Sequence, residues 1–241
     1  MTKTLPFPSD IVTLPRAEFL SEYVDIRAGE HVTLLGPTGS GKTTLSFELV
    51  NEAATPDLPA VVLVIKPVDP VVQKYMKQYK FKLVRHWPPL PSRWNQKPRG
   101  YVLWPKHSYD PDKDDPVLYK EMRKAILDSY KRGKRIIYVD EAWGLVDLGL
   151  QRELVTVWTR GRSGGAGIWA GSQRPAYIPL PAYSQADHLF LHYDADKRDR
   201  DRFKEIGGID PDLVESIVLR LQWHQWLYIR RKGPVYCIVD K

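Results

Sequence analysis

The sequence predicts an α/β domain in which a mainly parallel sheet is flanked by helices. Apolar, β-branched runs alternate along the chain with segments of helical periodicity, the order of elements that builds parallel sheets. The run AVVLVIKP (60–67) is apolar almost throughout, as expected for a strand buried on both faces. The closing stretch QWLYIRRKGPVYCIVD (225–240) alternates on both sides of a turn and predicts a C-terminal β-hairpin.

The individual elements follow from the same patterns. Strands are expected at 31–36, 60–67, 82–87, 101–105, 135–144, 167–175 and 187–193, and helices at 43–53, 70–79, 116–131, 150–159, 197–205 and 211–221. Residues 88–100 are Pro-rich without a period and predict a loop, and HSYDPDKDDP (107–116) predicts an acidic turn. The Pro-rich residues 1–25 are interpreted as an N-terminal arm and residues 26–241 as one domain.

Composition limits the class of protein. The chain has 241 residues, 43% hydrophobic and 27% charged, which suits a globular domain. No apolar run approaches the roughly 18 residues that span a bilayer, and the first residues lack the apolar segment of a signal peptide. A single cysteine, Cys237, excludes an internal disulfide and suits the cytoplasm. The net charge of +7 permits an anionic partner such as nucleic acid.

A phosphate-binding loop is predicted by GPTGSGKT (36–43), which follows an expected strand, precedes an expected helix and fits G-x-x-x-x-G-K-[ST]. Its glycines allow the backbone N–H groups to surround a triphosphate, Lys42 reaches the β- and γ-phosphates, and the Thr43 hydroxyl ligates Mg²⁺. The residues expected to bind ATP are Gly36, Pro37, Thr38, Gly39, Ser40, Gly41, Lys42, Thr43 and Thr44. The alternative is a Gly-rich turn without a ligand.

An acidic pair ends the apolar run IIYVDEA (136–142). Asp140 is the second expected Mg²⁺ ligand, and Glu141 can polarise an attacking water, which predicts a hydrolase. Several strand-like runs separate the two motifs along the chain, so at least one strand is expected between the two motif strands in the sheet. The alternative is two solvated acids at a strand end.

Polar residues also end the strand GIWAGSQRP (167–175). Because carboxyl ends of parallel strands meet at one edge, Gln173 is expected to point toward the γ-phosphate. Upstream, Arg160 and Arg162 lie in a Gly-rich turn, from which an arginine could reach ATP in a neighbouring subunit. We favour Arg162 for this role; ordinary surface arginines are the alternative.

The phosphate loop, the acidic pair and above all GRSGGAGIWAGSQRP (161–175) resemble the HerA/FtsK superfamily of DNA-pumping ATPases. The resemblance implies a RecA-like P-loop ATPase core with an additional strand and a catalytic glutamate, and a hexameric or pentameric ring around double-stranded DNA. It assigns phosphate and Mg²⁺ binding to Lys42 and Thr43, the Walker B positions to Asp140 and Glu141, and the sensor to Gln173. The family's trans-acting arginine usually stands nearer the strand, so both Arg160 and Arg162 remain candidates.

A motor without a membrane segment or a DNA-reading domain is similar to viral genome-packaging ATPases, which implies a host-cytoplasmic or virion-associated protein that docks on a capsid vertex or portal. Two alternatives remain open. One is an ATPase for filamentous phage assembly, export or conjugative DNA transfer; the other, which the acidic pair and Gln173 disfavour, is a P-loop kinase or small-molecule NTPase.

DNA contacts are expected from the loop 88–100, which carries basic residues and no acids. Arg93, Lys97 and Arg99 are the candidates, with Trp94 beside them. An ordinary loop anchored by its tryptophans is the alternative.

Overall fold

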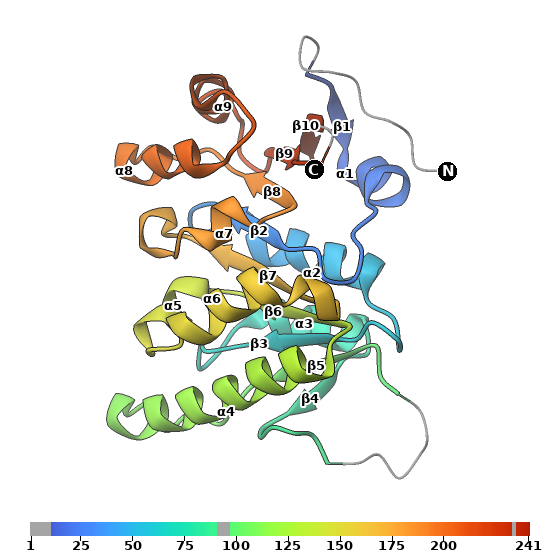
Figure 1. The fold of residues 1–241 in the computed structure, drawn as a ribbon, viewed down its shortest axis with the longest axis vertical. Coiled ribbons are helices and arrows are strands. Elements are labelled where there is room, and N and C mark those ends of the chain that lie inside the picture. The colour runs from blue at the N-terminus through green and yellow to red at the C-terminus, as the bar shows by residue number, and fades with distance from the viewer. Residues whose placement is uncertain (1–10, 91–96, 233–234) are drawn as a thin grey trace.

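The computed structural model describes residues 11–90, 97–232 and 235–241, and in this part of the chain ten strands form one sheet (Figure 1). Their order is β1-β10-β9-β8-β2-β7-β6-β3-β5-β4. Their bounds are β1 Thr13–Pro15, β2 Val32–Leu35, β3 Ala60–Leu63, β4 Lys82–Val84, β5 Gly100–Leu103, β6 Arg135–Val139, β7 Ala166–Ser172, β8 His188–Leu191, β9 Trp226–Arg230 and β10 Val235–Asp240.

The sheet is mainly parallel, as the sequence predicts. The pairs from β8 through β2, β7, β6, β3 and β5 to β4 are all parallel. At the other end β9 runs antiparallel to both β8 and β10, which confirms the predicted C-terminal hairpin. The predicted fold class, a mainly parallel sheet flanked by helices, is therefore confirmed.

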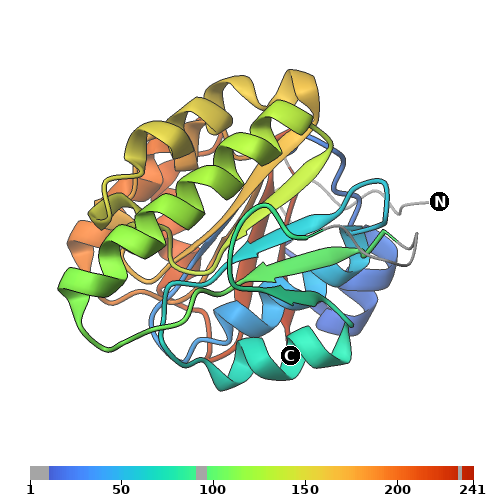
Figure 2. The same cartoon turned by 90° about the horizontal axis from the view of Figure 1, so that it is seen from below.

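Helices cover both faces of the sheet (Figure 2). The bounds are α1 Arg16–Glu18, α2 Lys42–Ala53, α3 Pro70–Gln78, α4 Pro111–Arg132, α5 Ala142–Asp147, α6 Gln151–Arg160, α7 Pro181–Ser184, α8 Lys197–Arg200 and α9 Pro211–Val218. One layer contains α2 and α3 and the other α4 and α6. Side chains of successive strand residues alternate between the two faces, so Val62 packs in the core under α2 and α3 while Val61 and Leu63 pack in the core on the other side.

Strand β7 lies between β2, which precedes the phosphate loop, and β6, which precedes the acidic pair. The expectation that a strand separates the two motif strands is thus confirmed. The separating strand is not one of those that lie between the motifs along the chain. Those strands, β3, β4 and β5, lie beyond β6, because the chain crosses the sheet after α2 and returns. This order brings the carboxyl ends of four parallel strands, β2, β7, β6 and β3, to one crevice.

The described part of the N-terminal arm packs on the far edge of the sheet. β1 pairs in parallel with β10, and a π-helical turn, Phe19–Tyr23, follows α1. Phe19 is fully buried, edge-on against Phe190 and Tyr228. Burial of an aromatic ring of this size contributes about 2 kcal/mol, so residues 13–23 are part of the packed structure.

Helix α4 differs from its prediction. It was expected to begin at Pro116 after an acidic turn, but it begins at Pro111, and Pro116 lies inside it. Asp110 caps the helix by accepting from the backbone N–H of Asp112, and acidic residues in the first turn favour the positive end of the helix dipole. The acids that suggested a turn therefore stabilise a helix start. The helix expected at 197–205 also differs, because α8 ends at Arg200 and a 3₁₀ turn, Asp201–Glu205, continues it.

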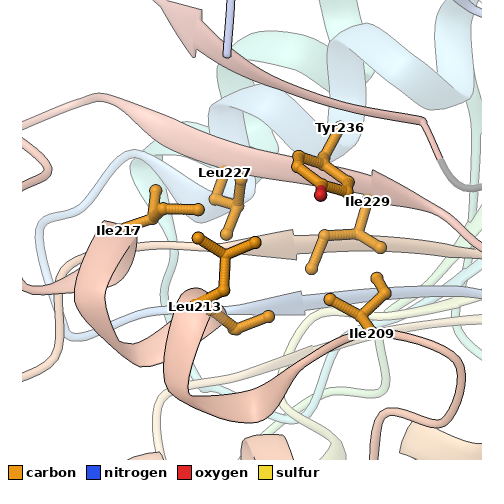
Figure 3. A pocket seen from close by; sticks show the side chains of 7 residues that line it. Ile209, Leu213, Ile217, Leu227, Ile229 and Tyr236 are labelled. Carbon is orange, nitrogen blue, oxygen red and sulfur yellow. The ribbon is translucent and has the colours of Figure 1, made fainter. Parts of the chain in front are cut away.

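Helix α9 packs against the C-terminal hairpin formed by β9 and β10. A small pocket between them is lined by hydrophobic side chains of the helix and of β9, with Tyr236 from β10 (Figure 3). No residue of the phosphate loop is among its lining, so this pocket is part of the core rather than of the crevice. Among the described residues, none of the helices combines the length and the hydrophobicity that crossing a lipid bilayer requires.

Candidate active site

The phosphate loop connects β2 to α2 at the carboxyl edge of the sheet. Gly39 and Gly41 have φ of 82° and 87°, in the left-handed region that favours glycine. Position 36 requires glycine, because a Cβ there would lie 2.7 Å from Cβ of His192. The loop lines a cavity of about 300 Å³. The cavity's lining includes Pro37, Thr38, Gly39, Ser40, Gly41, Lys42, Thr43 and Thr44, together with Lys66, Asp69, Val71, Glu141 and Gln173. All predicted ATP-binding residues except Gly36 therefore line one cavity, and Gly36 directly precedes them in the chain.

Lys42 begins α2, and its side chain turns back over the loop. Its Nζ donates a hydrogen bond to the Gly36 carbonyl at 3.2 Å. Burial lowers the pKa of the Lys42 ammonium, and the carboxylates of Glu141 and Asp140 partly offset this effect. A cation held at the helix N-terminus inside a loop of backbone N–H groups is suited to bind a polyphosphate.

Asp140 follows β6, and its buried carboxylate accepts hydrogen bonds from three side chains. The Thr43 hydroxyl donates to Oδ1 at 2.8 Å, and the Tyr138 hydroxyl donates to the same oxygen at 2.7 Å. Lys66 Nζ donates to Oδ2 at 3.0 Å. Burial alone would raise the pKa of Asp140, but the Lys66 ammonium and the donated hydrogen bonds hold that pKa below its usual value. The carboxylate is therefore charged at neutral pH.

The residues present fit a magnesium ion. A hydroxyl and a carboxylate lie 2.8 Å apart at Thr43 and Asp140, and hard oxygen ligands are those that Mg²⁺ prefers. The described part of the chain offers no cluster of three or more His, Cys, Asp or Glu side chains that could hold a metal alone. This agrees with a site that water and nucleotide phosphates complete.

Glu141 lies beside the predicted sensor. Ser172, the last residue of β7, donates its hydroxyl to Glu141 Oε1 at 3.0 Å, and the Gln173 backbone N–H donates to Oε2 at 3.3 Å. Burial raises the pKa of the Glu141 carboxyl, although the Lys42 ammonium opposes the shift. A buried carboxylate with a raised pKa on the wall of a phosphate cavity has the properties of a general base.

Gln173 connects that carboxylate to the phosphate loop. The Thr38 hydroxyl donates to its side-chain oxygen Oε1, while its backbone N–H contacts Glu141. Glycine at position 171 allows β7 to pass close to the backbone of Asp140, since a Cβ there would lie 2.7 Å from the Asp140 carbonyl oxygen. The structure therefore brings together Lys42, Thr43, Asp140, Glu141 and Gln173, all five predicted from the sequence.

The two arginines lie at the opposite edge of the sheet. They precede β7, whose seven residues separate them from Gln173 by about 20 Å. Arg162 forms a bidentate ion pair with Asp187, with N–O distances of 2.6 and 2.7 Å. Arg160 is exposed, and its guanidinium has no hydrogen-bond or ion-pair partner among the described residues. Neither arginine reaches the phosphate cavity of its own chain.

The residues predicted to contact DNA are only partly described. Arg93 lies outside the described residues, as does Trp94. Lys97 is exposed. Arg99 donates to the Ala54 carbonyl at 3.0 Å and to the Asn51 carbonyl at 2.5 Å, both at the end of α2. Its guanidinium therefore satisfies carbonyls of a helix C-terminus, which is a structural use of its charge.

Comparison with known proteins supports the fold. No protein-family model matches the chain, and no curated protein matches it in sequence. Solved structures do match. The DNA-packaging ATPase B204 of Sulfolobus turreted icosahedral virus superposes with a TM-score of 0.62 at 15% identity, covering 89% of this chain and 98% of its own. VirB4 of Thermoanaerobacter pseudethanolicus gives a TM-score of 0.60 at 10% identity, covering 88% and 89%.

A third match is the cytoplasmic domain of the type VII secretion ATPase EccC of Thermomonospora curvata, with a TM-score of 0.59 at 15% identity over 89% of this chain and 25% of that one. The chain has the fold of the HerA/FtsK-type P-loop ATPases. The resemblance that the motifs indicate is thereby confirmed at the level of the fold.

Three residues of this P-loop ATPase fold were not singled out from the sequence. Lys66 and Asp69 follow β3 and line the phosphate cavity, and His224 supports the loop from behind, with Nδ1 3.2 Å from the Ser40 carbonyl oxygen. The sequence does contain a pattern that indicates Lys66. This polar residue stands at the end of the apolar run AVVLVIKP (60–67), just as Gln173 follows the apolar run at 167–172. No comparable signal marks His224, which precedes an antiparallel strand far along the chain.

Proposed function

We propose that the protein hydrolyses ATP and uses the energy to move double-stranded DNA. The observation that carries the proposal is the chain of contacts from Glu141 through Gln173 to Thr38. It places a buried carboxylate, a side-chain amide and the phosphate loop on one wall of a cavity. A passive nucleotide-binding site does not require a basic carboxylate at that point, whereas hydrolysis does.

The reaction follows from these positions. The phosphate loop and Lys42 bind the β- and γ-phosphates, and Glu141 takes a proton from a water molecule as that water attacks the γ-phosphorus. The bond from the γ-phosphorus to the β–γ bridging oxygen breaks, so that ADP leaves and inorganic phosphate is formed. Mg²⁺, held by Thr43 and Asp140, would supply charge neutralisation on the phosphate oxygens. Gln173 lies between loop and carboxylate, where its amide changes partners when a γ-phosphate arrives or leaves. Because Gln173 directly follows β7, that change can be transmitted along the strand to the opposite edge.

DNA as the cargo is supported by the structural likeness to B204, which is a DNA-packaging ATPase, and by the net charge of +7. We extend the proposal to genome packaging by a homo-oligomeric ring of six or five subunits that docks on a capsid vertex or portal. The likeness to the secretion ATPase EccC makes export the competing function.

Measurement of ATP hydrolysis with and without double-stranded DNA tests this proposal. We expect DNA to raise the steady-state rate several-fold, with a stimulation that declines as salt rises because phosphate contacts are screened. Unchanged hydrolysis with DNA would favour export, and phosphate transfer to a small acceptor in place of water would identify a kinase. Either result contradicts the proposed motor.

The two arginines are proposed to have different roles. The bidentate pair with Asp187 occupies the Arg162 guanidinium, so we infer that Arg162 holds the turn in place. Arg160, exposed and unpaired among the described residues, is free to reach ATP in the next subunit. This reverses the preference for Arg162 that the sequence alone suggested.

A mixing experiment tests the assignment. Arg160→Ala is expected to lower hydrolysis by about 10³ to 10⁵ while each subunit still binds ATP. Mixed with Lys42→Ala subunits, it should partly recover activity, because some interfaces then pair an intact phosphate loop with an intact arginine. Arg162→Ala and Asp187→Asn should instead lower the melting temperature to a similar extent. Loss of hydrolysis in Arg162→Ala alone, with Asp187→Asn active, would return the trans role to Arg162.

A further inference from the structure

Lys66 places an ammonium group against the carboxylate that is proposed to hold the metal. It follows β3, the neighbour of β6 in the sheet, and its Nζ lies 3.0 Å from Asp140 Oδ2 and 3.2 Å from Asp69 Oδ2. The indole N–H of Trp104 donates to the Lys66 carbonyl at 2.7 Å and holds the backbone at this point. The side chain also lines the phosphate cavity.

The charge of Asp140 explains why a cation is needed there. Its side chain is only 5% exposed, and a buried carboxylate without a compensating charge is strongly unfavourable. Lys42 Nζ donates to the Gly36 carbonyl, and no ion pair joins it to Asp140 among the described residues. Among the described residues, Lys66 is the cation hydrogen-bonded to Asp140. It therefore supplies a positive charge in direct contact with this buried carboxylate.

The same position puts Lys66 in conflict with a divalent ion. An ion held by Asp140 would share this carboxylate with Nζ, which lies 3.0 Å from Oδ2, and two positive charges on one carboxylate repel strongly outside bulk water. The Lys66 side chain is 45% exposed and has a flexible stem, so it can move. Asp69 stays in place, because its Oδ1 accepts hydrogen bonds from the backbone N–H groups of Val71 and Val72, each at 3.0 Å.

We propose that Lys66 is a built-in substitute for the divalent cation. Its ammonium neutralises Asp140 while the site is empty of metal, leaves Asp140 when Mg²⁺ enters with the nucleotide, and then remains paired with Asp69. Lys66 is thus a positioning residue that keeps Asp140 oriented and sets the affinity of the site for metal. The inference rests on the proposed metal site at Thr43 and Asp140.

Binding of Mn²⁺ to the ADP-saturated full chain, followed by electron paramagnetic resonance, tests the proposal without any hydrolysis. Lys66→Met keeps the length of the side chain and removes its charge, so we expect Mn²⁺ to bind about tenfold more tightly than to the wild type, as loss of a nearby competing charge should produce. Lys66→Arg should stay near the wild type. Lys124→Met is a matched control, since Lys124 is 46% exposed and lies 3.3 Å from Glu121, which is 5% exposed, away from the crevice.

A second measurement reads the metal-free site. In EDTA without nucleotide, Lys66→Met should melt at a lower temperature than Lys66→Arg, because Asp140 loses its counter-charge. Equal or weaker Mn²⁺ binding by Lys66→Met overturns the proposal, as does a loss of ADP affinity in EDTA with unchanged Mn²⁺ binding, which would make Lys66 a phosphate ligand. Asp140→Asn separates the causes: if it also leaves Mn²⁺ binding unchanged, the metal site itself is elsewhere, and the proposed function loses its metal ligand too.

Discussion

Lys42→Ala is expected to abolish ATP hydrolysis and to weaken nucleotide binding. Lys42 is the buried cation of the phosphate loop, and its Nζ donates to the Gly36 carbonyl. Alanine removes that charge from the β- and γ-phosphates, where negative charge increases during transfer. Loss of one such stabilising group costs about 10² to 10³ in rate, and we expect at least that loss here.

The measurement is steady-state phosphate release together with the affinity for a fluorescent ATP analogue. Lys120→Ala is the control, because Lys120 is exposed on α4 and is not among the described residues that line the phosphate cavity. It should leave both quantities unchanged. Turnover near the wild-type rate in Lys42→Ala would contradict the assignment of the phosphate loop and the proposed ATPase activity.

Glu141→Gln is expected to bind ATP and to hydrolyse it very slowly. The substitution keeps the shape of the side chain but removes the basic oxygen, while the proposed metal ligands Thr43 and Asp140 remain. General-base catalysis contributes about 10² to 10⁴ in rate, so the variant should lose a factor in that range. The Gln173 backbone N–H can still donate to the amide oxygen, and the Ser172 hydroxyl, which donates to the other carboxylate oxygen in the wild type, can accept from the amide N–H₂ instead.

Single-turnover hydrolysis of prebound ATP separates binding from chemistry in this variant. The wild-type rate should also fall as pH decreases through the pKa of Glu141, and burial places that fall at a higher pH than for an ordinary glutamate. Glu141→Gln should lack this fall. Glu52→Gln, an exposed change near the end of α2, is the control. Normal hydrolysis in Glu141→Gln, or failure to bind ATP, would show that Glu141 is not the base.

Most residues of the crevice could be identified from the sequence, because they lie at the ends of strands. A glycine pattern between a strand and a helix, and polar residues at the ends of apolar runs, are local features that can be identified without knowledge of the strand order. In a parallel sheet such ends meet at one edge, so Gln173 and Asp140 could be placed together although they lie far apart along the chain. The same argument applies to Lys66, which was overlooked.

Only the tertiary structure decided which strand separates the motifs and which contacts the charged residues make. The insertion of β7 between β2 and β6 depends on how the chain crosses the sheet, and no local pattern records a crossover. The partner of Arg162 is Asp187, from the turn before β8, and the partner of Asp140 is Lys66, from the end of β3. Ion pairs of this kind join residues that are distant in sequence, so their existence depends on the packing of the whole sheet.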